Sequence, residues 1–151
     1  MKCQAMKSRA RKLFSGFTLM ELLIAIAIVA ILAAVAVPTY IHYTRKAYYA
    51  EVIMAGDRLK PAVSACLDER GGTLADCDGG AYGIPADIAA GGGVGQVDSV
   101  IVADGVITVT PADANGVAAA DTYVLTPTYS ATAGISWAVS GGGCTAGFVS
   151  C

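Results

Sequence analysis

The first third of the chain divides into a basic start and a long apolar run. From Leu22 to Ile41, about twenty residues pass without a charge, interrupted only by Pro38. At about 1.5 Å per residue, this apolar run predicts a helix of about 30 Å, which is the thickness of the hydrocarbon layer of a bilayer. Glu21 lies at the edge of the apolar run, where a carboxylate costs about 3 kcal/mol unless it has a partner. Pro38 should kink the helix, because proline removes one backbone hydrogen bond.

The helical pattern continues beyond the apolar run, now with polar residues on one side. Apolar residues recur every three or four positions and so share one helix face: Tyr48, Val52, Ala55, Leu59, Val63 and Cys66. We therefore expect one long helix from Phe17 to about Glu69, ended by Gly71-Gly72. Gly56 and Pro61 weaken the pattern, and the sequence leaves open whether the helix bends or breaks there.

The remainder predicts a loop followed by a sheet. Residues 71–95 contain three glycine runs and are typical of a flexible connection. Asp104-Gly105 predicts a two-residue hairpin turn. Pro127 indicates an edge position or a bulge. We expect the ring of Trp137 to be buried between sheet and helix. Four segments are rich in Val, Ile, Thr and aromatic residues and predict strands: Val97–Val102, Val106–Thr110, Thr122–Tyr129 and Ile135–Ser140. An antiparallel four-stranded sheet packed on the second half of the helix is the expected result.

The octet Gly16-Phe17-Thr18-Leu19-Met20-Glu21-Leu22-Leu23 joins the basic start to the apolar run. If the chain is cut after Gly16, the new α-amine of Phe17 lies one helical turn from Glu21. Copies packed side by side can then neutralise each other's charges, which is an assembly device.

This octet resembles the processing site of type IV prepilins, and the resemblance continues through Pro38 before it fades. It implies cleavage after Gly16 by a dedicated peptidase, N-methylation of Phe17, and Glu21 as the acid that sets the register of subunits. The implied fold is α+β, the type IV pilin fold: a long N-terminal helix, its apolar half protruding, packed on a four-stranded antiparallel sheet. The implied parts are a cleaved leader (1–16), a transmembrane and filament-core helix (17–41) and a head domain (42–151).

Two other interpretations of this region exist. A secretory signal peptide would account for the basic start and for Ala34-Val35-Ala36 as a cleavage site, but the apolar run exceeds the usual ~7–15 residues and Glu21 would be unexplained. The second interpretation is a plain anchor that spans the membrane once. Met6 offers a second translation start, which gives the same mature chain. Cys3 belongs to the leader and is not part of that mature chain. The basic start of the chain, which the signal-peptide interpretation uses, consists of Lys2, Lys7, Arg9, Arg11 and Lys12.

Removing the leader changes the charge balance. The leader holds five of the ten basic residues and none of the twelve acidic ones, so the mature chain has a net charge of about −7. Such a surface favours solubility, and it has no basic stripe with interleaved aromatic residues. Direct binding of nucleic acid is therefore not expected.

Four cysteines remain outside the leader and would lie where disulfides persist. Three pairings are possible, and proximity in the sequence favours Cys66–Cys77 and Cys144–Cys151. A four-cysteine zinc site is the alternative, but the Cys-x-x-Cys spacing is missing. The second pair also looks like the disulfide-bounded loop near the end of type IV pilins. Within it, Phe148 and Val149 are candidates for surface contact, either as an adhesive loop or as packing.

No catalytic constellation is apparent, and no cofactor or metal is expected. Asp76-Cys77-Asp78-Gly79 begins like a calcium loop, but the next ligand position is Gly80 and the closing Glu is missing. The glycine run before Gln96 has no Gly-Lys-Ser/Thr ending of a phosphate loop. His42 is the only histidine and lies beside Tyr40 and Tyr43, where aromatic residues anchor a membrane interface or pack between helices.

The leading hypothesis is a non-enzymatic structural subunit of a type IV pilus, which polymerises through its N-terminal helix into filaments for adhesion, twitching motility or DNA uptake. The resemblance implies a homopolymer, the prepilin peptidase and the inner-membrane assembly machinery as partners. It places the chain in the inner membrane before assembly and in the extracellular pilus afterwards. One alternative is a minor pilin or a type II secretion pseudopilin, although major pseudopilins generally lack the terminal cysteine loop. A less favoured one is an exported soluble β-rich binding domain released at Ala36.

Overall fold

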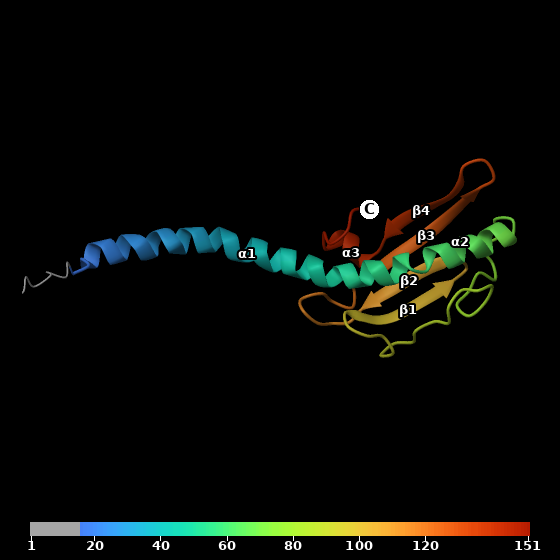
Figure 1. Cartoon of the computed structure of the whole chain (residues 1–151), viewed down its shortest axis with the longest axis horizontal. Helices are drawn as coiled ribbons and strands as arrows, with labels where there is room; N and C mark the ends of the chain where they lie inside the picture. The colour runs from blue at the N-terminus through green and yellow to red at the C-terminus, as the bar shows by residue number, and fades with distance from the viewer. Residues whose placement is uncertain (1–15) are drawn as a thin grey trace, which may run out of the picture. The chain divides into compact units, whose positions relative to one another are not determined.

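The structure is a computed structural model that describes residues 16–151. It contains two compact units, of which one ends at Thr39 and the other, the head unit, runs from Tyr40 to Cys151 (Figure 1). Apart from Gly16, the predicted leader with Met6 and Cys3 lies outside the described residues. The elements in chain order are α1 (Leu19–Asp57), α2 (Lys60–Glu69), β1 (Val97–Ala103), β2 (Val106–Pro111), β3 (Tyr123–Ser130), β4 (Gly134–Ser140) and α3 (Gly142–Thr145).

Helix α1 contains the whole apolar run and continues through Pro38. Two threonines near the proline bond back to the preceding turn: Thr39 Oγ1 donates to the Val35 carbonyl at 3.0 Å, and Thr44 Oγ1 donates to the Tyr40 carbonyl at 2.7 Å. Hydroxyls bonded in this way need no water, which suits a helix in an apolar setting. The kink at Pro38 stays a prediction.

The long helix breaks at Arg58-Leu59, the point that the sequence left open. Pro61 accounts for the break, because it has no N–H to donate to the Asp57 carbonyl and its fixed φ suits the first turn of a new helix. The Asp57 carboxylate accepts a bond from the Tyr123 hydroxyl at 3.3 Å and lies 2.8 Å from Lys60 Nζ. Burial, together with this carboxylate, raises the pKa of Tyr123 to about 12.

Helix α2 ends at the two glycines predicted to stop it. Gly71 takes a φ of +63°, its N–H donates to the Asp68 carbonyl at 3.3 Å, and the N–H of Gly72 donates to the Leu67 carbonyl at 2.7 Å. This pair of bonds is the Schellman motif, in which a residue in the left-handed region satisfies the last carbonyls of a helix. The predicted end of the helix is confirmed.

The four strands form one antiparallel sheet in the order β1-β2-β3-β4. Asp104 and Gly105 both have positive φ, at 48° and 71°, and join Ala103 to Val106, which confirms the predicted hairpin. Pro127 lies in the inner strand β3 and pairs with Trp137 of β4 in a regular register, so the prediction of an edge position or a bulge is wrong. It is tolerated because the pairing between β2 and β3 extends only as far as Leu125, so β2 has no partner residue opposite the proline.

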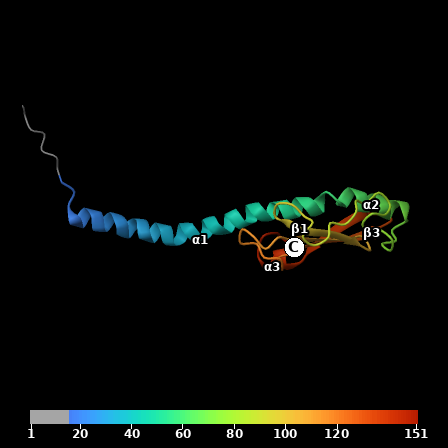
Figure 2. The ribbon, with the colours of Figure 1, turned by 90° about the horizontal axis from the view of Figure 1, so that it is seen from below.

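The hydrophobic core lies between one face of this sheet and the helices of the head unit (Figures 1 and 2). The expected stripe on α1 is off by one residue at Tyr48, which is exposed, whereas Tyr49 is fully buried. Gly56, one residue before the end of α1, is buried beside the Tyr123 ring. The core is built from Tyr49, Val52, Val63, Cys66, Leu67, Val100, Val102, Ile107, Val109, Tyr123 and Leu125, with Cys77, Ile84 and Val117 from the loops.

Trp137 packs against this core but is only half-buried, and it lies on the edge strand β4. Lys60 Nζ lies 5.9 Å from the centroid of the ring, within range of a cation–π contact. The predicted burial of Trp137 between sheet and helix is therefore only partly correct.

The segment between α2 and β1 has no strand or helix, as expected, but it protects the edge of the sheet. The backbone of Ile88 exchanges two hydrogen bonds with Val100, at 2.8 and 2.9 Å. Gly79 donates to the Val102 carbonyl at 2.9 Å, and the N–H of Val102 donates to the Asp87 carboxylate at 2.9 Å. A covered edge is not available for strand pairing with other chains.

Candidate functional site

Helix α1 begins with a reciprocal cap formed by Thr18 and Glu21. The N–H and the hydroxyl of Thr18 both donate to Oε2 of Glu21, at 3.1 and 3.0 Å, and the N–H of Glu21 lies 3.2 Å from Thr18 Oγ1. This is a capping box, in which the side chains at the cap position and three residues later satisfy each other's backbone N–H groups. This role of Thr18 is not among the roles expected from the sequence, although the Thr-x-x-Glu spacing signals it.

The cap holds the carboxylate of Glu21 at the amino-terminal end of the helix. A negative charge is favoured there, because the free N–H groups of the first turn carry partial positive charge. Gly16 and Phe17 precede the helix in an exposed, non-helical stretch, and no atom of the described residues lies within 4 Å of the place where a side chain at Gly16 would begin. The peptide bond between Gly16 and Phe17 thus joins two exposed residues that lie outside the helix, shortly before Glu21.

The side chains that follow the cap are apolar and uncovered. Every residue from Gly16 to Tyr43 is exposed. The helical stretch that begins at Leu19 contains a window of mean hydropathy 2.8, and it is long and apolar enough to cross a membrane. An apolar surface of this extent marks a site that lipid or another protein must cover. Ala34 and Ala36 of the alternative cleavage site lie within α1.

At the other end of the chain, the loop closed by the Cys144–Cys151 disulfide packs on α1 within the head unit. The Phe148 ring centroid lies 4.9 Å from that of Tyr49 and 6.3 Å from that of His42. Phe148 and Val149 are both half-buried against the core. Of the two roles expected for these side chains, the contacts therefore favour packing.

Tyr49 is the most buried residue of this contact. Its side chain is fully buried, and its hydroxyl has no hydrogen-bond partner among the described residues. Burial, with a smaller contribution from Asp121, raises the pKa of Tyr49 above its usual range. Gly143 is required beside it, since a Cβ there would overlap the hydroxyl.

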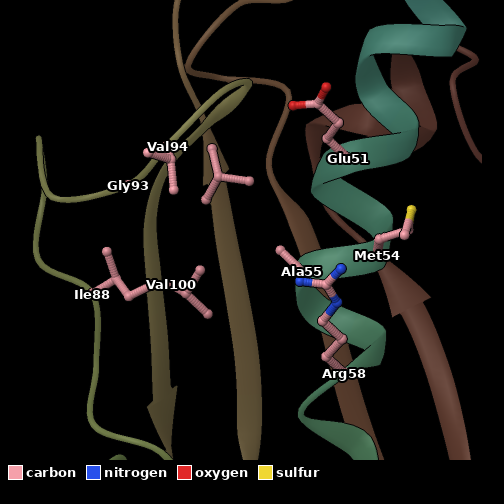
Figure 3. Close-up of a pocket in the computed structure, with 9 residues that line it drawn as sticks. Glu51, Met54, Ala55, Arg58, Ile88, Gly93, Val94 and Val100 are labelled. Atoms are coloured by element: carbon pink, nitrogen blue, oxygen red, sulfur yellow. The ribbon is translucent and has the colours of Figure 1, made fainter.

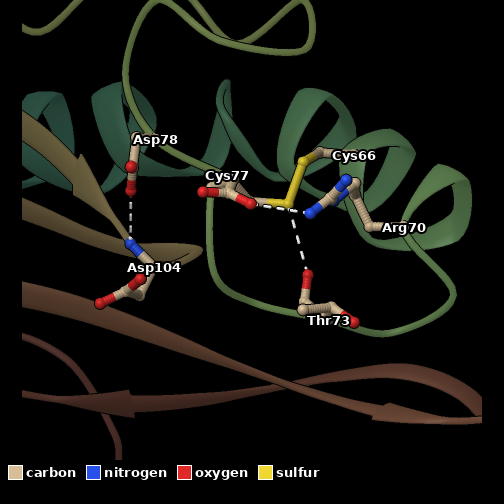
Figure 4. Close-up of a disulfide and its surroundings, with 7 residues drawn as sticks. Cys66, Arg70, Thr73, Cys77, Asp78 and Asp104 are labelled. Carbon is tan, nitrogen blue, oxygen red and sulfur yellow. Dashed lines mark hydrogen bonds and ion pairs between the residues drawn. A yellow bond between two sulfur atoms is a disulfide. The ribbon is translucent and has the colours of Figure 1, made fainter.

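The second disulfide joins Cys66 of α2 to Cys77 of the following loop (Figure 4). The loop is also held by charge: the Arg70 guanidinium lies 2.7 Å from the Asp76 carboxylate, and Asp78 accepts a bond from the N–H of Asp104 at 2.8 Å. The structure thus contains both disulfides that proximity in the sequence favoured. Asp76 and Asp78, the acids of the apparent calcium motif, bind protein groups instead.

Among residues 16–151, no three His, Cys, Asp or Glu side chains gather closely enough to hold a metal ion. The chemistry of the described residues thus concentrates at three places: the Thr18–Glu21 cap, the uncovered apolar run, and the disulfide-closed loop on α1.

Comparison with known proteins matches the first of these places to a described motif. Residues 11–37 match the family model of the prokaryotic N-terminal methylation motif. The chain is 40% identical to "Prepilin peptidase-dependent protein D" of Escherichia coli (strain K12) over 95 residues, which is 63% of this chain and 62% of the relative. It is 40% identical to a "Fimbrial protein" of Neisseria meningitidis (serogroup A / serotype 4A, strain DSM 15465 / Z2491) over 100 residues, 66% of this chain and 56% of the relative.

A third relative, "Type IV major pilin protein PilE1" of Neisseria gonorrhoeae, is 42% identical over 93 residues, which is 62% of this chain and 42% of that protein. The chain thus spans between about two fifths and two thirds of the length of these relatives. The chain carries a prokaryotic N-terminal methylation motif at the start of α1 and is related in sequence to the type IV pilins.

Proposed function

We propose that this chain is a structural subunit of a type IV pilus and that it polymerises through α1. The observation that carries the proposal is the uncovered apolar run headed by the Thr18–Glu21 cap, at the position of the methylation motif. The names of the relatives, which include a fimbrial protein and a major pilin, support a pilin over a pseudopilin. They also support a structural rather than an enzymatic role.

The mechanism is an exchange of apolar surroundings. Before assembly the apolar run lies in the inner membrane, where lipid covers its side chains. In the filament the same side chains pack against the helices of other copies, so little hydrophobic free energy is gained or lost. A prepilin peptidase first cuts after Gly16, and the new amine of Phe17 then pairs with the carboxylate of Glu21 in a neighbouring copy. Lipid offers no such charge partner, so this pair favours the filament.

In this proposal the work of extension belongs to the inner-membrane assembly machinery, and the finished filament is extracellular. Adhesion, twitching motility and DNA uptake are then properties of the polymer. The excess of acidic residues outside the leader does not favour direct binding of nucleic acid by the single subunit.

Gly16→Leu tests the proposal at its first step. The surroundings of Gly16 are open, so the larger side chain does not disturb the described fold. We expect the variant to stay in the membrane with the mass of the uncut chain and to be missing from the sheared surface fraction. The measurement is an intact mass of both fractions. Filaments built from an uncut Gly16→Leu chain would contradict the proposal.

A further inference from the structure

The head unit contains an open apolar groove between α1, β1 and the loop that precedes β1 (Figure 3). Two adjoining cavities of about 310 and 290 Å³ share the lining residues Ala55, Arg58, Ile88 and Val100. Met54 of α1 and Val94 of the loop both line the first of them (Figure 3). Nothing in the proposed packing of the apolar run uses this groove.

The walls of the groove are fixed by hydrogen bonds before any partner arrives. The N–H of Gln96 donates to Oε2 of Glu51 at 2.9 Å, which ties the loop to α1. The N–H of Gly93 donates to the Asp98 carbonyl at 2.9 Å, and that of Gly91 to the Asp98 carboxylate at 3.0 Å. Gly93 allows the tight turn, since a Cβ there would overlap the backbone of Val97. The glycine run thus builds a shaped wall, and a preformed surface binds with little ordering cost.

Apolar side chains of the groove are unusually exposed. Val94 is 86% exposed, Met54 54% and Ile88 38%. Among the residues that follow Tyr48 in the chain, the other large apolar side chains with comparable exposure are Tyr82 and Ile101. An apolar cluster of this kind, with charged residues at its rim, is typical of a protein contact surface.

Arg58 gives the groove a free positive charge. The ion pairs of the described residues use Lys60 and Arg70, and none uses Arg58. The head unit holds eleven acidic and five basic residues, so a second copy of the same chain presents mainly carboxylates. A cation beside exposed apolar groups therefore complements the acidic surface of another head unit.

The α1 wall of the groove also continues toward the apolar run. Met54 shares a helix face with Glu51, Ala47 and Tyr40, since these positions recur every three to four residues or a multiple of them. All four residues are on α1 and exposed, and Arg58 follows in the turn after Asp57. A second copy that packs along the helix would thus reach the groove without a gap in the contact.

We propose that this groove receives the head unit of a second copy of the chain in the filament, with Arg58 facing a carboxylate of that copy. The inference rests on the proposed function, because it needs a filament in which heads adjoin. It adds a head-to-head contact to the packing of the apolar run.

Thiol labelling at Val94 tests the contact. Val94→Cys places a free thiol at the rim of the groove, while both disulfides occupy the other cysteines of the described chain. We expect a maleimide to react about tenfold more slowly in sheared filaments than in detergent-dispersed subunits, because the centre of an interface excludes water. Ile101→Cys is the matched control, since it is apolar, exposed and outside the groove. Met54→Cys repeats the test from the helix side.

Equal labelling of Val94→Cys in filaments and in subunits would overturn the inference, and so would equal protection of Val94 and Ile101. Both results leave the proposed function intact, because filaments are present. If the unaltered chain forms no filaments at all, the proposed function fails first and the groove loses its partner with it.

Charge reversal tests the role of Arg58. We expect Arg58→Glu to lower the filament yield about tenfold, because a cation facing carboxylates becomes a like charge. Lys46→Glu makes the same change in net charge on α1, outside the groove, and we expect it to assemble normally. Equal yields from the two variants would overturn the assignment of Arg58.

Discussion

Thr18 and Glu21 share one role at the start of α1, and Glu21 has a second, proposed role. Thr18 and Glu21 together form the capping box, in which the Glu21 side chain accepts two bonds from Thr18. A glutamine can fill the same position in a capping box, so the cap needs an acceptor but no charge. The proposed pairing with the amine of Phe17 does need the charge. Substitution at each position can therefore separate the start of the helix from assembly.

We expect Glu21→Gln to lower the yield of sheared filaments at least about tenfold, because it leaves the Phe17 amine without a partner in an apolar core, at a cost of several kcal/mol. The amount of chain in the sheared fraction, relative to that in the membrane, measures the effect. Thr18→Val is the matched control: it removes the cap, which is worth about 1 kcal/mol, but leaves the charge. A Glu21→Gln chain that assembles as well as the unaltered one, or better than Thr18→Val, would refute the charge pairing.

Most of the helices and strands could be predicted from the sequence, because period and turn chemistry agree along the chain. The hairpin at Asp104-Gly105 and the helix end at Gly71 depend on local φ preferences, and both were found. The position of Pro127 was missed, because the extent of pairing between β2 and β3 is a property of the whole sheet. Tyr48 and Tyr49 could not be distinguished, since both fit a stripe of period 3.6 and only packing selects one.

The contact between α1 and the sheet depends on a glycine. Gly56 lies where a Cβ would be 3.0 Å from the Tyr123 ring and 3.3 Å from Cδ1 of Leu125. Helix propensity alone favours alanine over glycine by about 1 kcal/mol. Here the neighbouring ring is buried and hydrogen-bonded to Asp57, so it has little room to move.

We therefore expect Gly56→Ala to destabilise the chain by about 1 kcal/mol or more, against its helix propensity, because it overpacks the core. Urea unfolding of the full chain in detergent, followed by near-UV circular dichroism, gives the free energy of unfolding. Ala50→Gly, on an exposed position of the same helix, is the control and should lose only the propensity difference. A Gly56→Ala chain more stable than the unaltered one would show that the ring can yield.

Taken as a whole, the molecule combines an uncovered apolar helix with a small head that two disulfides reinforce. The Cys66–Cys77 disulfide closes a loop of sequence separation 11, and Cys144–Cys151 closes one of 7. The cap, the disulfide pairs and the apolar run could be recognised in the sequence by spacing. The contact between Phe148 and Tyr49 could not be recognised in the sequence, because it depends on where the end of the chain meets α1 in space.

Replacing both cysteines of one pair by serine separates the roles of the two disulfides. Each double variant should lose about 2–3 kcal/mol in the free energy of unfolding, since loops of this length restrict the unfolded chain by similar amounts. Only Cys144→Ser with Cys151→Ser should also free Phe148 from Tyr49, which near-UV circular dichroism of the tyrosines reports. It should therefore lower filament yield or adhesion. Unchanged filaments and adhesion in that variant would remove the terminal loop from the account.

The central claim is that the chain is cut after Gly16 and polymerises through the helix that then begins at Phe17. The most direct test is the N-terminal residue and intact mass of the chain recovered from sheared surface filaments. The account predicts an abundant chain that starts at N-methylated Phe17, with the mass deficit of two disulfides. A chain that starts at Val37, or one missing from the filaments, would contradict it.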